Sequence, residues 1–164
     1  MDFEIEYGVR LYKKIGTVVS PALFGQKIVF SDFGLNHLFR KRKRFRSMRE
    51  QKKRFQFLLH VPEIIMAKHA VVVYNERTLT SRSRARYWVF LAKINGQNIK
   101  VVILQIDEGS LEFLSVMEDY KNQKILQSYN QANQGSRQSP LPVAPWTHPD
   151  YAARVDPLYL RERG

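Results

Sequence analysis

Two polar residues on an otherwise apolar stripe are the strongest candidates for chemistry in this sequence. From Phe33 to about His60 the pattern is helical, and the apolar side chains that fall on one buried stripe about 100° wide are Leu38, Phe45, Met48, Phe55 and Leu59. Lys41 falls near the middle of this stripe, and His37 falls at its edge one helical turn earlier. A histidine can transfer a proton near neutral pH, and a lysine can stabilise negative charge in a transition state. Alternatively, Lys41, like Lys52, extends past the apolar surface into water.

Several kinds of chemistry are excluded by what the sequence lacks. There is no cysteine, which excludes thiolate nucleophiles, iron–sulfur clusters and Cys-ligated zinc. The sequence has no glycine-rich phosphate loop, no histidine pair at ligand spacing and no clear acidic constellation, so we expect neither a metal nor a cofactor. The remaining types, His, Lys, Arg, Tyr and a hydroxyl, suit metal-free RNA cleavage. In that reaction a base takes the 2′-hydroxyl proton, cations stabilise the phosphorane, and an acid protonates the leaving 5′-oxygen.

The positive charge is concentrated in one segment. The chain has 27 Lys and Arg against 15 Asp and Glu, which gives a net charge of +12. Ten basic residues and a single acid, Glu50, lie between Arg40 and Arg54, so this segment alone carries +9. Like charges four residues apart on a helix repel each other. We therefore expect an external polyanion, for which a phosphate backbone fits best; an acidic protein or a membrane surface is the alternative.

A second, smaller basic cluster lies between Arg77 and Arg86. Together the two clusters predict nucleic-acid contacts at Arg40, Arg42, Lys43, Arg44, Arg46, Arg49, Lys53, Arg77, Arg82 and Arg84. The longest apolar runs are far too short to span a membrane, so we expect no membrane partner.

The elements that must position these residues suggest an α+β fold. Residues Glu4–Val19 read as one or two short strands, and the long basic helix from Phe33 ends before Pro62. Four strands are predicted after it, at Ala70–Tyr74, Arg86–Ile94, Ile99–Asp107 and Ser110–Met117. Turn signals at Asn95-Gly96 and Glu108-Gly109 make the last three an antiparallel meander. The prediction is a long basic N-terminal helix packed on a four-stranded antiparallel sheet. Because the strands are apolar on both faces, the second face must be partly covered or form a cleft.

Composition divides the chain into three parts. Residues 1–26 are predicted to form an N-terminal strand or arm, and residues 27–127 a nuclease-like domain that ends in a short helix over Glu118–Gln127. Residues 128–164 are predicted to be a polar linker followed by a Pro-rich tail, which is either disordered or docks its aromatic residues on the domain.

The residues from Lys27 to Met117 resemble the barnase–EndoU–colicin–RelE superfamily of ribonucleases, whose phage and toxin members place a helix before an antiparallel sheet. The resemblance is carried by GLNHLFRKRKRFRSMREQKKRFQFLLHVPEII, VVVYNERT, RYWVFLAKINGQNIKVVILQI and GSLEFLSVM. It implies that His37 is the general base or acid and that Lys41 is a cation for the phosphate or the transition state. It further implies a strand-side cation at Arg77 or Arg86, a stacking or proton-relay group at Tyr87, and a final-strand hydroxyl at Ser115. The second histidine of EndoU-like members has no clear counterpart here.

The favoured function is therefore a metal-independent endoribonuclease, a cytoplasmic toxin or effector that cleaves tRNA or mRNA and is held in check by an acidic inhibitor. The first alternative is a non-catalytic RNA- or DNA-binding protein that uses the basic helix over residues 34–59. The second is an interaction protein that binds an acidic partner. Each site residue also has a simpler explanation: Arg77 and Arg86 only bind phosphate, Tyr87 packs in the sheet, and the Ser115 hydroxyl is hydrogen-bonded within the core.

Overall fold

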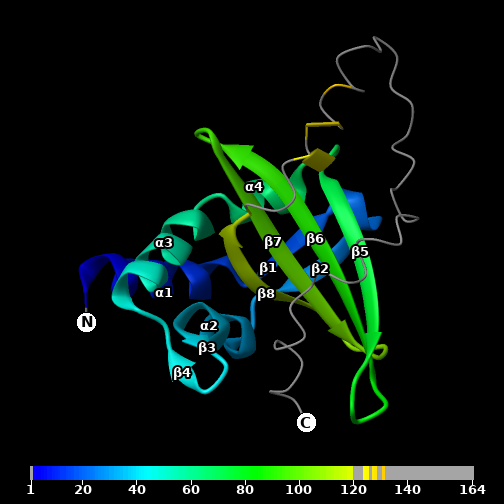
Figure 1. Ribbon diagram of the computed structural model, residues 1–164, viewed down its shortest axis with the longest axis horizontal. Helices are drawn as coiled ribbons and strands as arrows, with labels where there is room; N and C mark the ends of the chain where they lie inside the picture. The colour runs from blue at the N-terminus through cyan, green and yellow to red at the C-terminus, as the bar shows by residue number, and fades with distance from the viewer. Residues whose placement is uncertain (1, 120–123, 126, 129–130, 132–164) are drawn as a thin grey trace.

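The structure is a computed structural model that describes residues 2–119, 124–125, 127–128 and 131. In these residues the fold is α+β, with helices on one side of a mixed sheet (Figure 1). The helices are α1 (Phe3–Ile15), η1 (Pro21–Leu23), α2 (Asp32–Phe39), α3 (Met48–Leu58) and α4 (Val61–Met66). The strands are β1 (Thr17–Ser20), β2 (Gln26–Val29), β3 (Arg40–Lys41), β4 (Arg44–Phe45), β5 (Val71–Thr78), β6 (Arg84–Ile94), β7 (Gln97–Ile106) and β8 (Leu111–Glu118).

The main sheet is larger than the predicted one. Its six described strands lie in the order β1-β2-β8-β7-β6-β5, and β2 runs parallel to β8 while every other pair is antiparallel. Strands β5 to β8 are the predicted antiparallel unit, so that part of the prediction is confirmed. Asn95 and Gly96 have φ angles of 49° and 80°, the pair of positive values that a tight hairpin turn between β6 and β7 requires. The predicted sheet is incomplete because β1 and β2 extend it beyond β8.

Of the strands predicted over Glu4–Val19, the part before Gly16 is wrong, because residues 3–15 form helix α1, and the part after it is strand β1. The Asp2 side chain accepts a hydrogen bond from the Glu4 amide at 3.1 Å, which caps the helix at its N-terminus. Its buried residues, Ile5, Gly8 and Tyr12, have helical spacing. The ideal Cβ position on Gly8 lies 2.4 Å from the Phe55 ring, so this glycine permits close packing of α1 on α3.

The single long helix over residues 33–60 is also wrong. Helix α2 ends at Phe39, the hairpin β3–β4 follows, and α3 begins at Met48. Five consecutive cations, from Arg40 to Arg44, would repel each other on a helix, and Arg42 adopts a φ of 58° that breaks it. Ser47 and Glu50 then form a capping box that starts α3. Of the five residues expected on one buried stripe, Leu38 and Phe55 are buried, whereas the exposed ones are Phe45, Met48 and Leu59.

The sheet has an apolar core on each face, as predicted. One face packs against the helices and includes Leu38, Phe55 and Phe113. The other holds Tyr87, Val102 and Leu114, with Phe33 and Ile125 among the partly buried residues packed against it. Figure 1 shows α1, α2 and α3 gathered beside the sheet, with the hairpin β3–β4 at the outer edge of this group.

Glycine at position 34 brings α2 close to the sheet. An ideal Cβ on Gly34 would lie 2.2 Å from the Phe113 carbonyl oxygen and 2.4 Å from the Tyr12 hydroxyl. Both distances are too short for a methyl group, so this position accepts only glycine without a shift of the helix or of β8. His37 follows one turn later on α2 and therefore points to a similar side of the helix.

The last part of the chain is described at only a few positions. The described residues near the predicted short helix, 124–125 and 127–128, are helical. The Pro-rich tail and all of the polar linker except Ser128 and Gln131 lie outside the described residues. None of the helices in the described part of the chain is long and apolar enough to cross a membrane.

Candidate nucleic-acid interface

The hairpin β3–β4 carries five adjacent cations on a short two-stranded ribbon. Arg40 pairs with Phe45, and Lys41 pairs with Arg44, which leaves Arg42 and Lys43 as the two turn residues. The φ of 58° at Arg42 occupies a position that glycine or asparagine usually takes in a hairpin turn. All five cations are exposed. The chain therefore places an arginine where a glycine would fit the turn better, and the tip gains a charge.

The base of the hairpin is fixed by buried polar contacts. Arg46 is 6 % exposed, and its Nε donates a hydrogen bond to the His37 carbonyl oxygen at 3.3 Å. Its backbone amide donates to the Phe39 carbonyl oxygen at 2.8 Å, which continues the hairpin ladder. The Gln51 side-chain amide donates to the Arg46 carbonyl oxygen at 2.8 Å. These contacts hold the exposed tip in a defined position relative to α2 and α3.

Four of the ten clustered cations have hydrogen-bond or ion-pair partners within the protein. Lys52 lies 2.9 Å from both Asp2 and Glu4 of α1, and this contact lowers the pKa of Asp2 and raises that of Lys52. Lys53 forms an ion pair with Glu118 of β8. The four are Arg46, Lys52, Lys53 and Arg54. Arg46 and Lys53, expected on nucleic acid, therefore have partners within the fold.

The other six cations in this segment have no carboxylate partner in the described residues. They are Arg40, Lys41, Arg42, Lys43, Arg44 and Arg49. The carboxylates of Asp2, Glu4 and Glu118 neutralise lysines of α3 instead. Within the segment from Arg40 to Arg54, the cations without a carboxylate partner in the described residues thus lie on the hairpin and in the first turn of α3.

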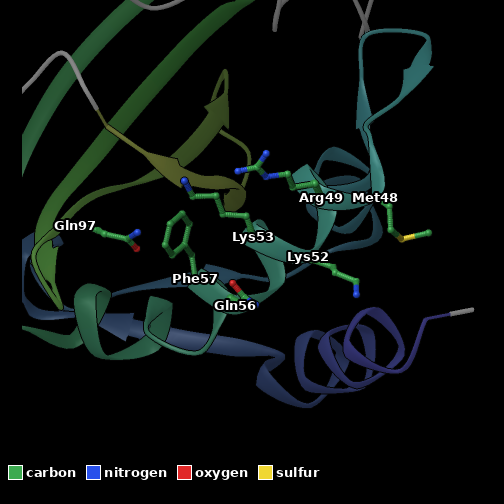
Figure 2. A pocket seen from close by; sticks show the side chains of 7 residues that line it. All are labelled: Met48, Arg49, Lys52, Lys53, Gln56, Phe57 and Gln97. Atoms are coloured by element: carbon green, nitrogen blue, oxygen red, sulfur yellow. The ribbon is translucent and has the colours of Figure 1, made fainter.

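A surface groove of about 550 Å³ continues from the hairpin along α3 (Figure 2). It is lined by Met48, Arg49, Lys52, Lys53, Gln56, Phe57 and Gln97. Figure 2 shows Arg49 and Met48 at the end of α3 next to the hairpin, and Lys52 directed toward α1. The Lys53 ammonium lies 5.8 Å from the centre of the Phe57 ring. The cations and amides of this shallow groove are groups that can contact phosphates and bases.

Protein-family models, curated proteins and solved structures give no match to this chain. The assignment of the interface therefore depends on its geometry alone. Among the described residues, no three acidic or histidine side chains come together as they would at a metal site.

The pair expected to act from one helical face is separated in the structure. His37 is 4 % exposed on α2, where its ring packs edge-on against Phe33 with centroids 4.7 Å apart. Lys41 lies on the exposed hairpin strand β3, because α2 ends before it. The expectation that the two residues lie one helical turn apart on one side of a helix is wrong.

The other expected catalytic residues are divided between the two faces of the sheet. Tyr87 belongs to the apolar cluster on the face away from the helices, whereas Arg86 lies on the opposite face and pairs with Glu76 and Glu108. The fully buried Ser115 hydroxyl accepts a hydrogen bond from Arg54 Nη1 at 2.5 Å. For Ser115 this is the simpler explanation given above, a hydroxyl bonded within the core.

The Tyr87 hydroxyl is buried, and no hydrogen-bond partner for it occurs in the part of the chain that the structure describes. Burial raises the pKa of Tyr87 to about 12. Asn75 is its register partner on β5, and the buried side-chain nitrogen of Asn75 likewise has no hydrogen-bond partner in the described residues. Two polar groups without partners therefore lie opposite each other on one face of the sheet.

The second basic cluster is largely compensated. Arg84 lies 3.2 Å from Glu76, and Arg86 pairs with the same carboxylate. The Tyr74 hydroxyl donates to Glu76, and this bond and the two arginines lower the pKa of that carboxylate. Arg77 is half-buried on β5, and Arg82 is exposed in the turn between β5 and β6. This cluster is a weaker candidate for phosphate binding than the hairpin.

Two exposed apolar residues beside the hairpin were not predicted as site residues. Phe45 is 66 % exposed and Met48 is 53 % exposed, although both were expected in the core. The signal that could have identified them is the run of five cations directly before Phe45, which leaves more than one helical turn without an apolar side chain.

Proposed function

We propose that this protein binds nucleic acid through the hairpin β3–β4 and the adjoining outer face of α3. The observation that carries the proposal is the set of six exposed cations that have no carboxylate partner in the described residues. Other cations of the same segment are neutralised by carboxylates of α1 and β8. A polyanion that approaches the hairpin would relieve the repulsion among these charges and release its own condensed counterions.

A nucleic-acid backbone fits this surface better than an isolated anion does. The cations lie on a ribbon and continue to Arg49 at the start of the groove on α3, so they form an extended track rather than a single site. The amides of Gln56 and Gln97 line the same groove and can donate to phosphate oxygens. An acidic protein, such as an inhibitor, is expected to compete for the same cations. The proposal keeps the expected cytoplasmic location.

The direct test is binding of labelled RNA, followed by fluorescence anisotropy. A double charge reversal at the tip, Arg42→Glu with Arg44→Glu, is expected to weaken binding by about 10- to 1,000-fold, because two attractive contacts become repulsive. The matched control changes net charge equally at two exposed lysines outside the hairpin, Lys27→Glu with Lys68→Glu. Equal affinity loss in both variants would mean that only net charge matters and that the hairpin is not the site.

RNA cleavage is the second candidate function. One observation favours it: the Tyr87 hydroxyl and the Asn75 amide lie on one face of the sheet, and Phe33, which contacts His37, packs against the apolar cluster of that face. The resemblance to the barnase–EndoU–colicin–RelE ribonucleases gives catalytic roles to two residues of this region, His37 and Tyr87. The low exposure of His37 and its separation from Lys41 count against it, because a general base must touch its substrate.

This second candidate is tested with purified protein, total RNA and excess EDTA. Cleavage that leaves 2′,3′-cyclic phosphates and is lost in His37→Ala would support it, since attack by the 2′-hydroxyl gives that product. Intact RNA with the wild-type protein, alongside normal RNA binding, would leave nucleic-acid binding as the function.

A further inference from the structure

An aromatic residue accompanies the cations of the hairpin and indicates which form of nucleic acid binds there. Phe45 ends strand β4 and is 66 % exposed. Its register partner Arg40 lies across the hairpin, with the guanidinium carbon 4.3 Å from the centre of the Phe45 ring. Arg40 and Phe45 thus form a cation–π pair on the surface of the ribbon.

We propose that the hairpin binds single-stranded nucleic acid and that Phe45, supported by Arg40, is the platform on which an unpaired base stacks. This inference rests on the proposed nucleic-acid binding and adds the substrate class. Unpaired bases have free faces that stack on aromatic rings and guanidinium planes, whereas the bases of a duplex are already stacked on each other. An exposed phenylalanine has no equivalent use on a duplex backbone, where only charge and polar groups contact the phosphates.

The surroundings of Phe45 fit a strand rather than a helix of nucleic acid. Lys41, Arg42, Lys43 and Arg44 are exposed on the same short ribbon as Phe45 and can contact phosphates that flank the stacked base. Met48, 53 % exposed, follows Phe45 by three residues and leads into the groove on α3. A strand that stacks one base on Phe45 can continue over Met48 and Arg49 into the groove on α3. A single strand can follow this path directly, whereas a duplex would have to unstack a base to reach Phe45.

The experiment compares four labelled oligonucleotides of equal length on the full chain: single-stranded RNA, single-stranded DNA, an abasic DNA strand and duplex DNA. The abasic strand keeps the phosphates and removes the bases. We expect the two single strands to bind more tightly than the abasic strand and the duplex. Comparable affinity for RNA and DNA would show that the base and not the 2′-hydroxyl is contacted; tighter RNA binding would add a sugar contact to the stack.

The variant that tests the platform is Phe45→Ala. It should weaken binding of the single strands by about 5- to 150-fold, the range for loss of one base–aromatic stack, and leave the abasic strand unaffected. Phe24→Ala is the matched control, because Phe24 is 89 % exposed at the turn between η1 and β2. Phe45→Trp should retain binding, and its added fluorescence should be quenched by single strands relative to the wild-type signal.

The outcomes separate this inference from the function on which it rests. If no oligonucleotide binds, the proposed function itself fails. If all four bind and Phe45→Ala behaves as the wild type, the hairpin binds phosphates only and the stacking inference is overturned. Preference for the duplex over both single strands would overturn it as well, and would indicate that the ribbon enters a groove of the double helix.

Discussion

The side chain of Arg46 donates a hydrogen bond to the main-chain carbonyl oxygen of His37, at 3.3 Å. This contact joins the residue after the hairpin β3–β4 to the helix before it, and Arg46 is buried while its neighbours at the tip are exposed. Arg46 therefore maintains the shape of the hairpin, whereas Arg40, Arg42 and Arg44 of the hairpin present charge to solvent.

Arg46→Ala is expected to lower stability, whereas Arg44→Ala is expected to weaken nucleic-acid binding. Loss of the buried Arg46 contact should lower the free energy of unfolding by about 1–3 kcal/mol, because the His37 carbonyl loses its charged donor. Arg44→Ala should change stability by less than about 0.5 kcal/mol and weaken nucleic-acid binding instead. Urea denaturation and anisotropy measured on both variants check this. The assignment fails if Arg44→Ala is the more destabilising of the two.

Ser115→Ala is expected to act on stability and not on any catalytic step. The Ser115 hydroxyl accepts from Arg54 Nη1 at 2.5 Å, and the same nitrogen donates to the Val116 carbonyl oxygen at 3.0 Å. Removing the hydroxyl leaves a buried guanidinium with one fewer acceptor, which should cost about 1–3 kcal/mol. Urea denaturation measures this cost. Unchanged stability combined with loss of RNA cleavage would reverse the interpretation and give Ser115 a role in catalysis.

Tyr87→Phe should change how stability depends on pH at the alkaline end. Burial raises the pKa of Tyr87 to about 12 in the folded protein, against an ordinary value of about 10. The buried neutral phenol therefore contributes stability that is fully present below pH 10 and is lost as the pH rises through 12. The loss should be about 2 kcal/mol in the wild type relative to Tyr87→Phe, measured by urea denaturation across this range.

At neutral pH the same variant should be about as stable as the wild type. The Tyr87 hydroxyl has no hydrogen-bond partner among the residues that the structure describes, so its removal breaks no such contact there. A loss of more than about 2 kcal/mol at pH 7 would contradict this account and would show that the hydroxyl is bonded.

Gly34→Ala tests how closely α2 packs on β8. Alanine in place of glycine normally stabilises a helix interior by about 1 kcal/mol. Here the added methyl group would lie 2.2 Å from the Phe113 carbonyl oxygen, and the resulting displacement should cost about 1–3 kcal/mol or more, which outweighs the propensity gain. Thermal denaturation should therefore show a lower Tm for Gly34→Ala, while Asn36→Ala at an exposed position of α2 should not lower it. A higher Tm for Gly34→Ala would mean that α2 and β8 are less tightly packed than described.

The sheet was largely predictable because its signals are local. A tight two-residue hairpin turn needs positive φ at both central positions, and Asn-Gly is a pair that adopts these angles readily. Asn95-Gly96 is therefore a strong local signal for the turn between β6 and β7. The strands on either side follow from that turn and from their β-branched composition. By contrast, the pairing of β2 with β8 joins residues more than eighty positions apart and leaves no local signal.

The two wrong predictions, a strand over the residues of α1 and one long helix over residues 33–60, have different physical causes. In residues 4–11 the apolar side chains alternate with polar ones, which indicates a strand, yet the residues that become buried are Ile5, Gly8 and Tyr12 at helical spacing. In residues 33–60 the apolar spacing is satisfied by two short helices as well as by one long one. The capping pair Ser47 and Glu50 and the five-cation run were the signals for a break.

For the candidate site, the sequence predicts where the cations lie along the chain, but not which of them are exposed and which are paired with carboxylates. The sequence shows where Arg40 to Arg54 lie, but the division into exposed and compensated cations depends on carboxylates from α1 and β8 that only the fold brings near. The placement of Arg86 and Tyr87 on opposite faces follows from strand alternation, which was available from the sequence. The burial of His37 was not, because it depends on how α2 meets β8.

The most direct test of the central claim is the salt dependence of nucleic-acid affinity for the wild type and for Arg42→Glu with Arg44→Glu. For a single strand, log K should fall with log salt with a slope of about −0.7 per phosphate contact, so five or six contacts give a slope between about −3.5 and about −4.2. The double variant should lose about 1 to 1.5 units of this slope, while Lys27→Glu with Lys68→Glu keeps it. Affinity that stays flat with salt, or a slope equal in all three proteins, would contradict a phosphate-binding hairpin.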